Sequence, residues 1–370
     1  MPISSRKDLM YQVMENMTGM VRIVDPDNNV IYMNKSMKEE FGDITGKKCH
    51  TMLCRENKCD LCVSLNSIEA NVAQSKEVHV RNKIYRVIAS PATDSDNEKY
   101  SIEIFYDITE QKFLEEESRK HYEKLKGDIE FAKHIQKKTL PEDKAYWNAI
   151  RSYSSYYPSQ DLSGDLFDVV RVNDDSVLFY IADVSGHGVR SSLLTIFLRQ
   201  IIRGMKTAAA DPIIVLAQII KEYKALNLDE EQYISLLYGV YNSKTKGLTM
   251  INAGHNCLPI VMENKDGKNT KMTELDIRGL PVCSLVNAPN HEIKTLQMEK
   301  GDKILLYTDG ITEAVNYDNK VFGTERLKKI ISEIGITDGK KLAEGIIDEA
   351  RNFAGGSPTD DMAVLVLELL

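Results

Sequence analysis

The sequence predicts an α+β protein with two domains joined by a long helix. Its 370 residues exceed what one hydrophobic core usually organises. Short apolar runs with strand-like alternation lie on both sides of a highly charged stretch at 109–140. In the C-terminal part, helical patterns arrive in pairs, which argues against βαβ units and for antiparallel sheets packed with helices.

The N-terminal part reads as an antiparallel sheet with helices on one side. A short helix starts near Leu9, and residues 19–25 and 29–34 form two strands joined by the turn-rich DPDNN. Residues 77–90 alternate around a polar Arg-Asn-Lys centre, and residues 98–108 form another alternating run.

The charged stretch 109–140 is predicted to be one helix that ends before Pro141. Apolar residues recur on it at helical spacing: Tyr122, Leu125, Ile129 and Ala132. So narrow a stripe favours a coiled-coil linker that pairs two chains. The alternative is a solvated helix lying on its own domain.

Beyond Pro141 the pattern runs from strands to helices twice and ends on a strand. Residues 166–172 and 176–184 form a hairpin. Two helices follow, and the second begins at Asp211 and Pro212, which suit a helix cap and a first turn. Five further strands are expected at 233–242, 248–254, 258–263, 291–298 and 303–309. A helix at 325–335, a second helix after it and a last strand at 362–369 follow.

Composition excludes several classes of protein. Asp and Glu outnumber Lys and Arg by 55 to 47, giving a net charge of -8 that disfavours nucleic acid and anionic membranes as partners. No stretch approaches 18 uncharged apolar residues, and the first residues lack the apolar core of a signal peptide. We therefore expect a cytoplasmic protein without a membrane segment.

The stretch IADVSGHG places Asp183 at the end of an apolar run, directly before a glycine-rich turn. A nucleophile elbow would need glycine at that position, two residues before Ser185. A dinucleotide fingerprint would need glycine where Ser191 stands. A metal site or a purely structural turn remains.

Other carboxylates occupy equivalent places, each at a strand end beside small or turn-forming residues: Asp165, Asp309, Asp360 and Asp361. One such aspartate alone would be an ordinary turn or cap. If several converge, their repulsion requires compensating cations, and oxygen ligands select magnesium or manganese. Two such ions about 3.5 to 4 Å apart can activate water for attack on a phosphoester.

These motifs, together with AKHIQKKTLP, NAGHNCLP and GLPVCSL, resemble the SpoIIE- and RsbU-type bacterial serine/threonine phosphatases of the metal-dependent PPM class, over about residues 130–370. The resemblance implies an αββα sandwich with two Mn²⁺ or Mg²⁺ ions at one edge. Asp183 would bridge both ions, and the carbonyl of Val184 would complete one coordination sphere. The other ligands would be Asp165, Asp309 and Asp360, with a share for Asp361 left open.

Two histidines near these motifs are given lesser roles by the same resemblance. His187 belongs to the turn rather than serving as a general base, and His255 positions structure near the site. Ser163 departs from the usual Gly-Gly-Asp pattern before Asp165 without removing a ligand.

The N-terminal region, with DPDNNVIYMN and the closing DITE, is similar to PAS sensor domains. The predicted organisation is a PAS-like domain at 8–110, a helical linker at 111–140 and a phosphatase domain at 141–370. A sensor joined by a helix to an enzyme implies that a signal shifts the linker and thereby the metal site.

A cluster of cysteines within this region predicts a second site: Cys49, Cys54, Cys59 and Cys62. Four thiols so close together suit zinc or an iron–sulfur cluster, a redox pair, or inert packing. Only the Cys59-x-x-Cys62 part has a common ligand spacing.

The function expected is a sensor-regulated, metal-dependent serine/threonine phosphatase that acts as a homodimer through its linker and PAS domain. By resemblance, its substrate is a phosphorylated STAS-domain protein, an anti-sigma-factor antagonist. The alternatives are a non-catalytic scaffold that binds a phosphoprotein, and a hydrolase of small phosphoesters. Retention of Asp165, Asp183, Asp309 and Asp360 argues against the scaffold.

Overall fold

The computed structural model describes residues 6–53, 57, 59–186, 188–228, 232–264, 270–356 and 358–370. Its internal contacts divide the chain into two compact units, Met1–Lys124 and Leu125–Leu370. No helix within the described ranges is long and apolar enough to cross a membrane.

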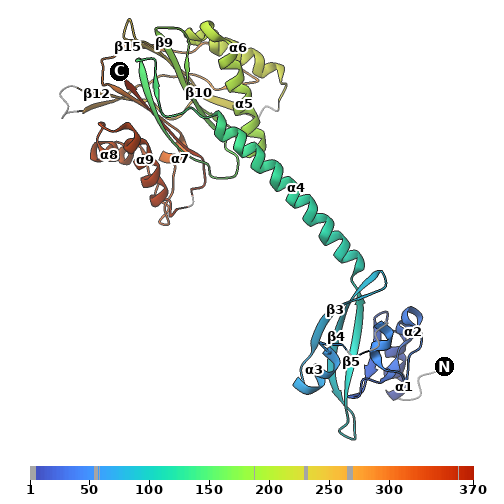
Figure 1. Cartoon of the computed structure of the whole chain (residues 1–370). Helices are drawn as coiled ribbons and strands as arrows, with labels where there is room; N and C mark the ends of the chain where they lie inside the picture. Colours follow the sequence, from blue (N-terminus) through green and yellow to red (C-terminus); the bar gives the residue numbers. More distant parts are fainter. Residues whose placement is uncertain are drawn as a thin grey trace. The chain divides into compact units, whose positions relative to one another are not determined.

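The first unit is built on an antiparallel sheet whose described strands follow the order β2-β1-β5-β4-β3 (Figure 1). The strands are β1 (Met20–Val24), β2 (Val30–Met33), β3 (Gln74–Val80), β4 (Lys83–Thr93) and β5 (Lys99–Asp107). The predicted hairpin 19–34 is confirmed, and segment 77–90 forms parts of two strands because Arg81 turns the chain with φ of 53°.

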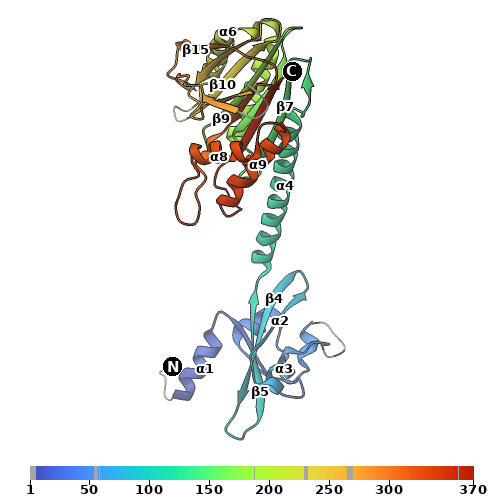
Figure 2. The same ribbon diagram turned by 90° about the vertical axis from the view of Figure 1, so that its left-hand side faces the viewer.

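Helices cover one face of this sheet (Figure 2). They are α2 (Lys35–Phe41), α3 (Val63–Ala70) and the 3-10 turn Cys49–Leu53, whereas no described side chain of helix α1 (Arg6–Asn16) belongs to this core. Met37, Met52 and Val63 from these segments pack with Tyr85 and Phe105 of the sheet in a single core. The prediction of a sheet with helices on one side is therefore confirmed.

Helix α4 (Thr109–Thr139) confirms the predicted continuous helix between the two sheet-containing parts of the sequence. Side chains of its apolar stripe are largely open in a single chain: Tyr122 is 68% and Leu125 58% exposed. Pairing of two chains through this stripe stays a prediction.

The second unit holds two antiparallel sheets. One follows the order β15-β11-β10-β9-β8, with β14 beside β10, and the other the order β13-β12-β16-β17-β7-β6. Their strands are β6 (Ala145–Tyr146), β7 (Ile150–Tyr157), β8 (Asp165–Arg171), β9 (Ser176–Val184), β10 (Tyr233–Asn242), β11 (Gly247–Ala253), β12 (Ile260–Asn264), β13 (Thr270–Glu274), β14 (Val282–Cys283), β15 (Ile293–Gln297), β16 (Lys303–Tyr307) and β17 (Met362–Leu369).

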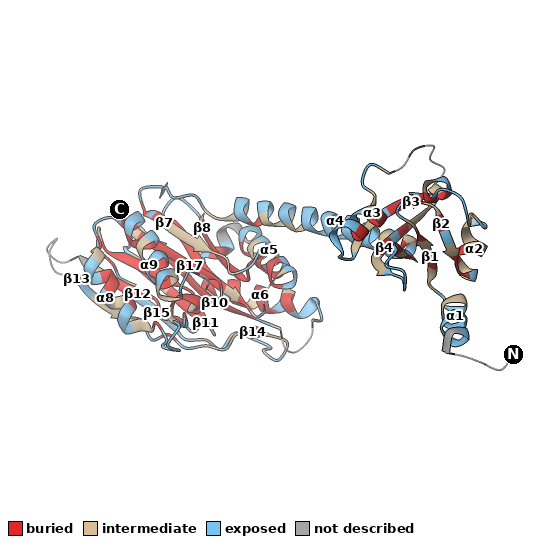
Figure 3. Cartoon of the chain, turned by 90° about the horizontal axis from the view of Figure 1, so that it is seen from below, coloured by how far each residue is buried: buried red, intermediate tan, exposed pale blue. Residues whose placement is uncertain are grey.

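The layers of this unit follow from three apolar clusters. Phe167 and Ile181 of one sheet meet Leu306 and Leu365 of the other in a central core. Helices α5 (Val189–Gly204) and α6 (Pro212–Ala225) cover the outer face of the first sheet. Helices α8 (Thr324–Ile334) and α9 (Gly339–Phe353) cover the second, and buried residues concentrate in the strands between (Figure 3). The predicted αββα sandwich is confirmed.

Candidate metal centre

Two of the predicted acids lie side by side at one end of the first sheet. Asp165 is the first residue of β8 and Asp183 the last but one of β9, and the two residues are register partners. Asp165 is buried at 3% exposure, whereas Asp183 is partly exposed. The hairpin therefore brings two carboxylates to the same edge.

The second sheet brings its acids to the same place. Asp309 opens the short helix α7 (Asp309–Thr312) directly after β16, and Asp360 and Asp361 precede β17. The hydroxyl of Thr308 donates a hydrogen bond to Oδ2 of Asp165 at 2.8 Å, so the two sheet edges are in direct contact.

Asp360 and Asp361 differ in their surroundings. Asp361 is buried, and its carboxylate accepts hydrogen bonds from the backbone of Ser159 at 2.7 Å and of Gly164 at 2.9 Å. Asp360 is exposed, and its Oδ1 accepts from the backbone N–H of Asp361 at 2.8 Å. Asp361 therefore holds the backbone of Ser159 and Gly164 in place, whereas the carboxylate of Asp360 is more accessible to solvent.

Burial and mutual repulsion raise the pKa values of Asp165 and Asp183. Burial, and next the charges of Asp183 and Asp361, holds the pKa of Asp165 well above its usual range. Burial, and next the charges of Asp309, Asp360, Asp361 and Glu313, raises the pKa of Asp183 to about 7. Such a cluster of like charges is unfavourable unless protons or cations neutralise it.

Two glycines permit the close approach of the strand ends. A Cβ on Gly164 would lie 2.7 Å from the carbonyl oxygen of Val184, and a Cβ on Gly310 would lie 2.0 Å from that of Asp361. The sequence therefore leaves the carbonyl of Val184 directly beside the backbone that precedes Asp165. Any larger residue at either position would push the edges apart.

Two further residues at this edge were not predicted. Glu313 follows Asp309 by four residues, so it faces the same side, and burial together with the charges of Asp309 and Asp360 raises its pKa. Thr308 is fully buried and touches Asp165. The spacing of four residues from Asp309 was the one feature of the sequence that could have placed Glu313 at the site. No feature of the sequence singled out Thr308.

His255 has a structural environment. Its ring lies between the carbonyl oxygen of Tyr307 at 2.9 Å from Nε2 and the hydroxyl of Ser235 at 3.2 Å from Nδ1. Burial lowers its pKa to about 4, so the imidazole is neutral, with Nε2 donating to the carbonyl. His187 lies outside the described residues.

The donors at this edge fit a hard divalent cation. They are carboxylate oxygens and one backbone carbonyl, which are the ligands that Mg²⁺ and Mn²⁺ prefer. The charged groups that shift the pKa of Asp183 are all acidic, so their negative charges add up at this edge. No group of three or more His, Cys, Asp or Glu side chains in the described ranges is already arranged around a single point that could hold an ion. Side-chain rotation at Asp165 and Asp183 would be part of binding.

The cysteine cluster shows no metal-holding group within the part of the chain that the structure describes. Cys49, Cys59 and Cys62 are free thiols, and Cys54 lies outside the described residues. The Sγ atoms of Cys49 and Cys62 lie 3.9 and 3.5 Å from Oδ1 of Asn28. Burial raises the pKa of Cys49 to about 11, which keeps it a protonated thiol. The prediction of zinc or an iron–sulfur cluster is not supported.

Each of the two units matches a known protein family. Residues 173–370 match the family model of Stage II sporulation protein E (SpoIIE), and residues 17–110 match a PAS domain. Phosphoserine phosphatase RsbU of Bacillus subtilis (strain 168) is 24% identical over 248 residues, which cover 66% of this chain and 71% of RsbU. Phosphoserine phosphatase RsbP of the same organism is 25% identical over 191 residues, covering 51% of this chain and 46% of RsbP.

The solved structures agree in fold. The SiaA-PP2C domain of Pseudomonas aeruginosa superposes with a TM-score of 0.56 at 18% identity, covering 68% of this chain and 99% of that domain. The SpoIIE match spans more than half of the chain and contains Asp183, Asp309 and Asp360. The chain therefore belongs to the SpoIIE family of PPM-type serine/threonine phosphatases, with a PAS domain preceding the phosphatase domain.

Proposed function

We propose that this chain is a sensor-regulated, metal-dependent protein serine/threonine phosphatase whose active site is the acidic edge of the sandwich. The observation that carries the proposal is the meeting of Asp165 and Asp183 from one sheet with Asp309 and Asp360 from the other. Residues 141–370 form the phosphatase domain, residues 111–140 the linker and residues 8–110 the sensor domain.

In this proposal the carboxylates of Asp165, Asp183, Asp309 and Asp360 and the carbonyl of Val184 would hold two Mn²⁺ or Mg²⁺ ions. When bound, such ions lower the pKa of coordinated water and withdraw charge from phosphoryl oxygens. The net reaction forms a bond from water oxygen to phosphorus and breaks the bond from phosphorus to the serine oxygen. That oxygen takes a proton from the water.

The chain's own residues prepare the edge for this reaction. Thr308 orients Asp165 through one carboxylate oxygen and leaves the other available. Asp361 holds the backbone of Ser159 and Gly164, which fixes the loop before Asp165. Burial of Asp165 keeps bulk water away from its carboxylate and would strengthen its interaction with a cation.

The proposed substrate is a phosphoserine or phosphothreonine protein of the STAS type, an anti-sigma-factor antagonist. RsbU and RsbP, to which the chain is similar, are phosphoserine phosphatases. The match covers under half of RsbP, so the partner of the whole chain is inferred from the phosphatase domain. The proposed homodimer forms through the PAS domain and α4, supported by the exposed Tyr122 and Leu125.

The test measures phosphate release by the full chain from a phosphoserine peptide with and without MnCl₂. The comparison includes Asp183→Asn and a matched control, Asp175→Asn, in the exposed turn of the same hairpin. We expect metal-dependent turnover that Asp183→Asn abolishes and Asp175→Asn retains. Binding of a phosphoprotein without turnover would identify a scaffold, and faster hydrolysis of p-nitrophenyl phosphate than of any phosphoprotein would identify a small phosphoester hydrolase.

A further inference from the structure

Gln136 stands apart from the rest of α4. It is the only buried residue that the structure describes in this helix, at 5% exposure. An amide side chain is buried at a net cost unless its polar atoms find partners. Its contacts therefore need an explanation beyond helix formation.

The amide of Gln136 pairs with the backbone of a single residue, Ser163. Nε2 donates to the carbonyl oxygen of Ser163 at 2.8 Å, and Oε1 accepts from its N–H at 3.2 Å. Nε2 also lies 3.5 Å from Oγ1 of Thr195 in α5. The two-way pairing fixes both the orientation of the amide and the position of Ser163.

Ser163 lies two residues before Asp165 and is coupled to it. The Ser163 hydroxyl accepts a hydrogen bond from the N–H of Asp165 at 3.0 Å. Gly164, between them, donates its N–H to Asp361 and accepts from the N–H of Val184 at 3.1 Å. A displacement of Ser163 is therefore passed to Asp165 and to the backbone of Val184.

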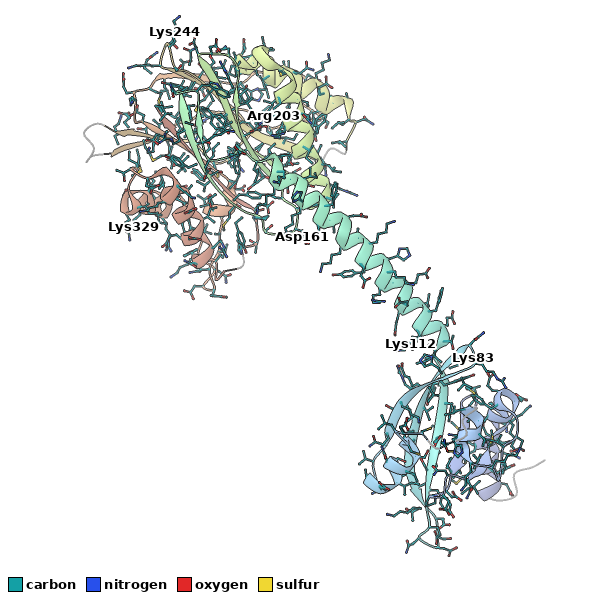
Figure 4. All side chains as sticks on the ribbon, viewed as in Figure 1. Lys83, Lys112, Asp161, Arg203, Lys244 and Lys329 are labelled. Carbon is teal, nitrogen blue, oxygen red and sulfur yellow. The ribbon has the colours of Figure 1, made fainter. Side chains whose placement is uncertain are left out.

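The other contacts between α4 and this loop are looser. Lys133, one turn earlier, forms an ion pair with Asp161 at 3.2 Å, with both side chains exposed (Asp161 is labelled in Figure 4). Ile129, another turn earlier, borders an open hollow of about 600 Å³ that Leu162 and Val189 also line. An exposed ion pair and a hollow constrain the loop weakly, so the buried amide is the firm connection.

We propose that Gln136 is a positioning residue for the metal centre: by fixing Ser163, it sets the placement of Asp165 and of the Val184 carbonyl and hence the affinity for the ions. The inference rests on the proposed function of the acidic edge. It makes the last turns of α4 part of the support of the active site, and a shift of α4 changes ion affinity through this one side chain.

The test compares full-length Gln136→Met with wild type and with Gln111→Met, the same substitution at an exposed position of α4. Methionine keeps the length of the side chain and helix propensity but loses both hydrogen bonds. Mn²⁺ binding is measured by calorimetry, and kcat and KM for p-nitrophenyl phosphate are measured across a Mn²⁺ titration. Gln136→Glu is a second variant that keeps the acceptor for the Ser163 N–H and loses the donor.

We expect Gln136→Met to weaken Mn²⁺ binding about ten- to a hundredfold, the usual effect of removing a partner that orients a metal ligand. Saturating Mn²⁺ should restore kcat, KM should stay unchanged, and Gln111→Met should match wild type. Unchanged Mn²⁺ affinity with a lower melting temperature would reduce Gln136 to a structural anchor and overturn the inference. If Gln136→Met does not fold, Gln136→Glu decides by the same criterion.

One further comparison separates this inference from the proposed function. Asp183→Asn is titrated with Mn²⁺ in parallel. If neither it nor the Gln136 variants change Mn²⁺ affinity, the metal centre itself is misplaced. If Asp183→Asn loses Mn²⁺ and the Gln136 variants retain it, only the positioning role fails.

Discussion

The hydroxyl of Thr308 donates a hydrogen bond to the carboxylate of Asp165 at 2.8 Å and accepts one from the N–H of Ala363 at 2.9 Å. Thr308 directly follows β16, Ala363 lies in β17, and Asp165 opens β8 in the other sheet. One buried hydroxyl thus connects the two sheets at the acidic edge.

Thr308→Val keeps the shape of this side chain and removes its hydroxyl. We expect a loss of about 1 to 3 kcal/mol in the free energy of unfolding, because the N–H of Ala363 loses a buried acceptor. Phosphatase activity should fall more than stability, since Asp165 loses its orienting partner. Urea unfolding and Mn²⁺-dependent rates measure the two effects. Thr249→Val in β11, where the exposed hydroxyl lies 3.4 Å from that of Thr295, serves as the control.

Gly310→Ala should disrupt the site by sterics alone. The added Cβ would lie 2.0 Å from the carbonyl oxygen of Asp361, which forces β17 and α7 apart. We expect loss of activity together with a lower melting temperature. Gly127→Ala in α4 is the matched control, because no atom lies within 4 Å of its Cβ. That variant should be stabilised by up to about 1 kcal/mol, and a stable, active Gly310→Ala protein would contradict the close approach.

His255 should make the fold sensitive to acid. Its pKa is lowered to about 4 by burial, against about 6.5 in an unfolded chain. Between these values the unfolded chain binds the proton and the folded chain does not, so stability falls as the pH drops from about 6.5 to about 4. The loss approaches about 3 kcal/mol.

The measurement for His255 is the pH dependence of urea unfolding in the presence of a chelator. His255→Gln retains a donor for the Tyr307 carbonyl and does not titrate. The stability difference between wild type and variant should therefore shrink by about 3 kcal/mol between pH 7.5 and pH 4. Parallel curves for the two proteins would show that folding does not shift the pKa of His255.

Removing metal should reveal the repulsion among the acids. Mn²⁺ is expected to raise the melting temperature of wild type and to leave Asp183→Asn almost unchanged. In chelator, Asp183→Asn should melt above wild type, because one negative charge has left a buried cluster of like charges. Scanning calorimetry with MnCl₂ and with EDTA gives both values. A chelated wild type as stable as the variant would mean that the carboxylates do not repel one another.

Much of the fold was predictable because its strands carry a local signal. Residues 176–184 and 362–369 are continuous apolar runs bounded by turn residues, as strands buried on both faces require. Strand β7 was missed because its sequence IRSYSSYY lacks such a run, and its conformation follows from pairing with β17. Helices α2 and α3 were missed because each spans only two turns.

The site was predictable in part for a similar reason. Asp165, Asp183 and Asp309 each mark a strand end beside small or turn-forming residues, and the family resemblance assigns them a common role. Thr308 and Gln136 gave no such signal. Their importance depends on which sheet edges and which helix turn meet in space, and a single charged helix does not show which of its glutamines is covered.

The acids of the site are divided between two sheets whose inner faces pack together in an apolar core. If a cation binds to both edges as proposed, its binding and the alignment of the two sheets would stabilise each other by an equal free energy. A signal that displaces one sheet slightly relative to the other would then change the occupancy of the ion sites. Regulation of the proposed metal centre would then require no effector bound at the acidic edge, only a change in how the two sheets pack against each other.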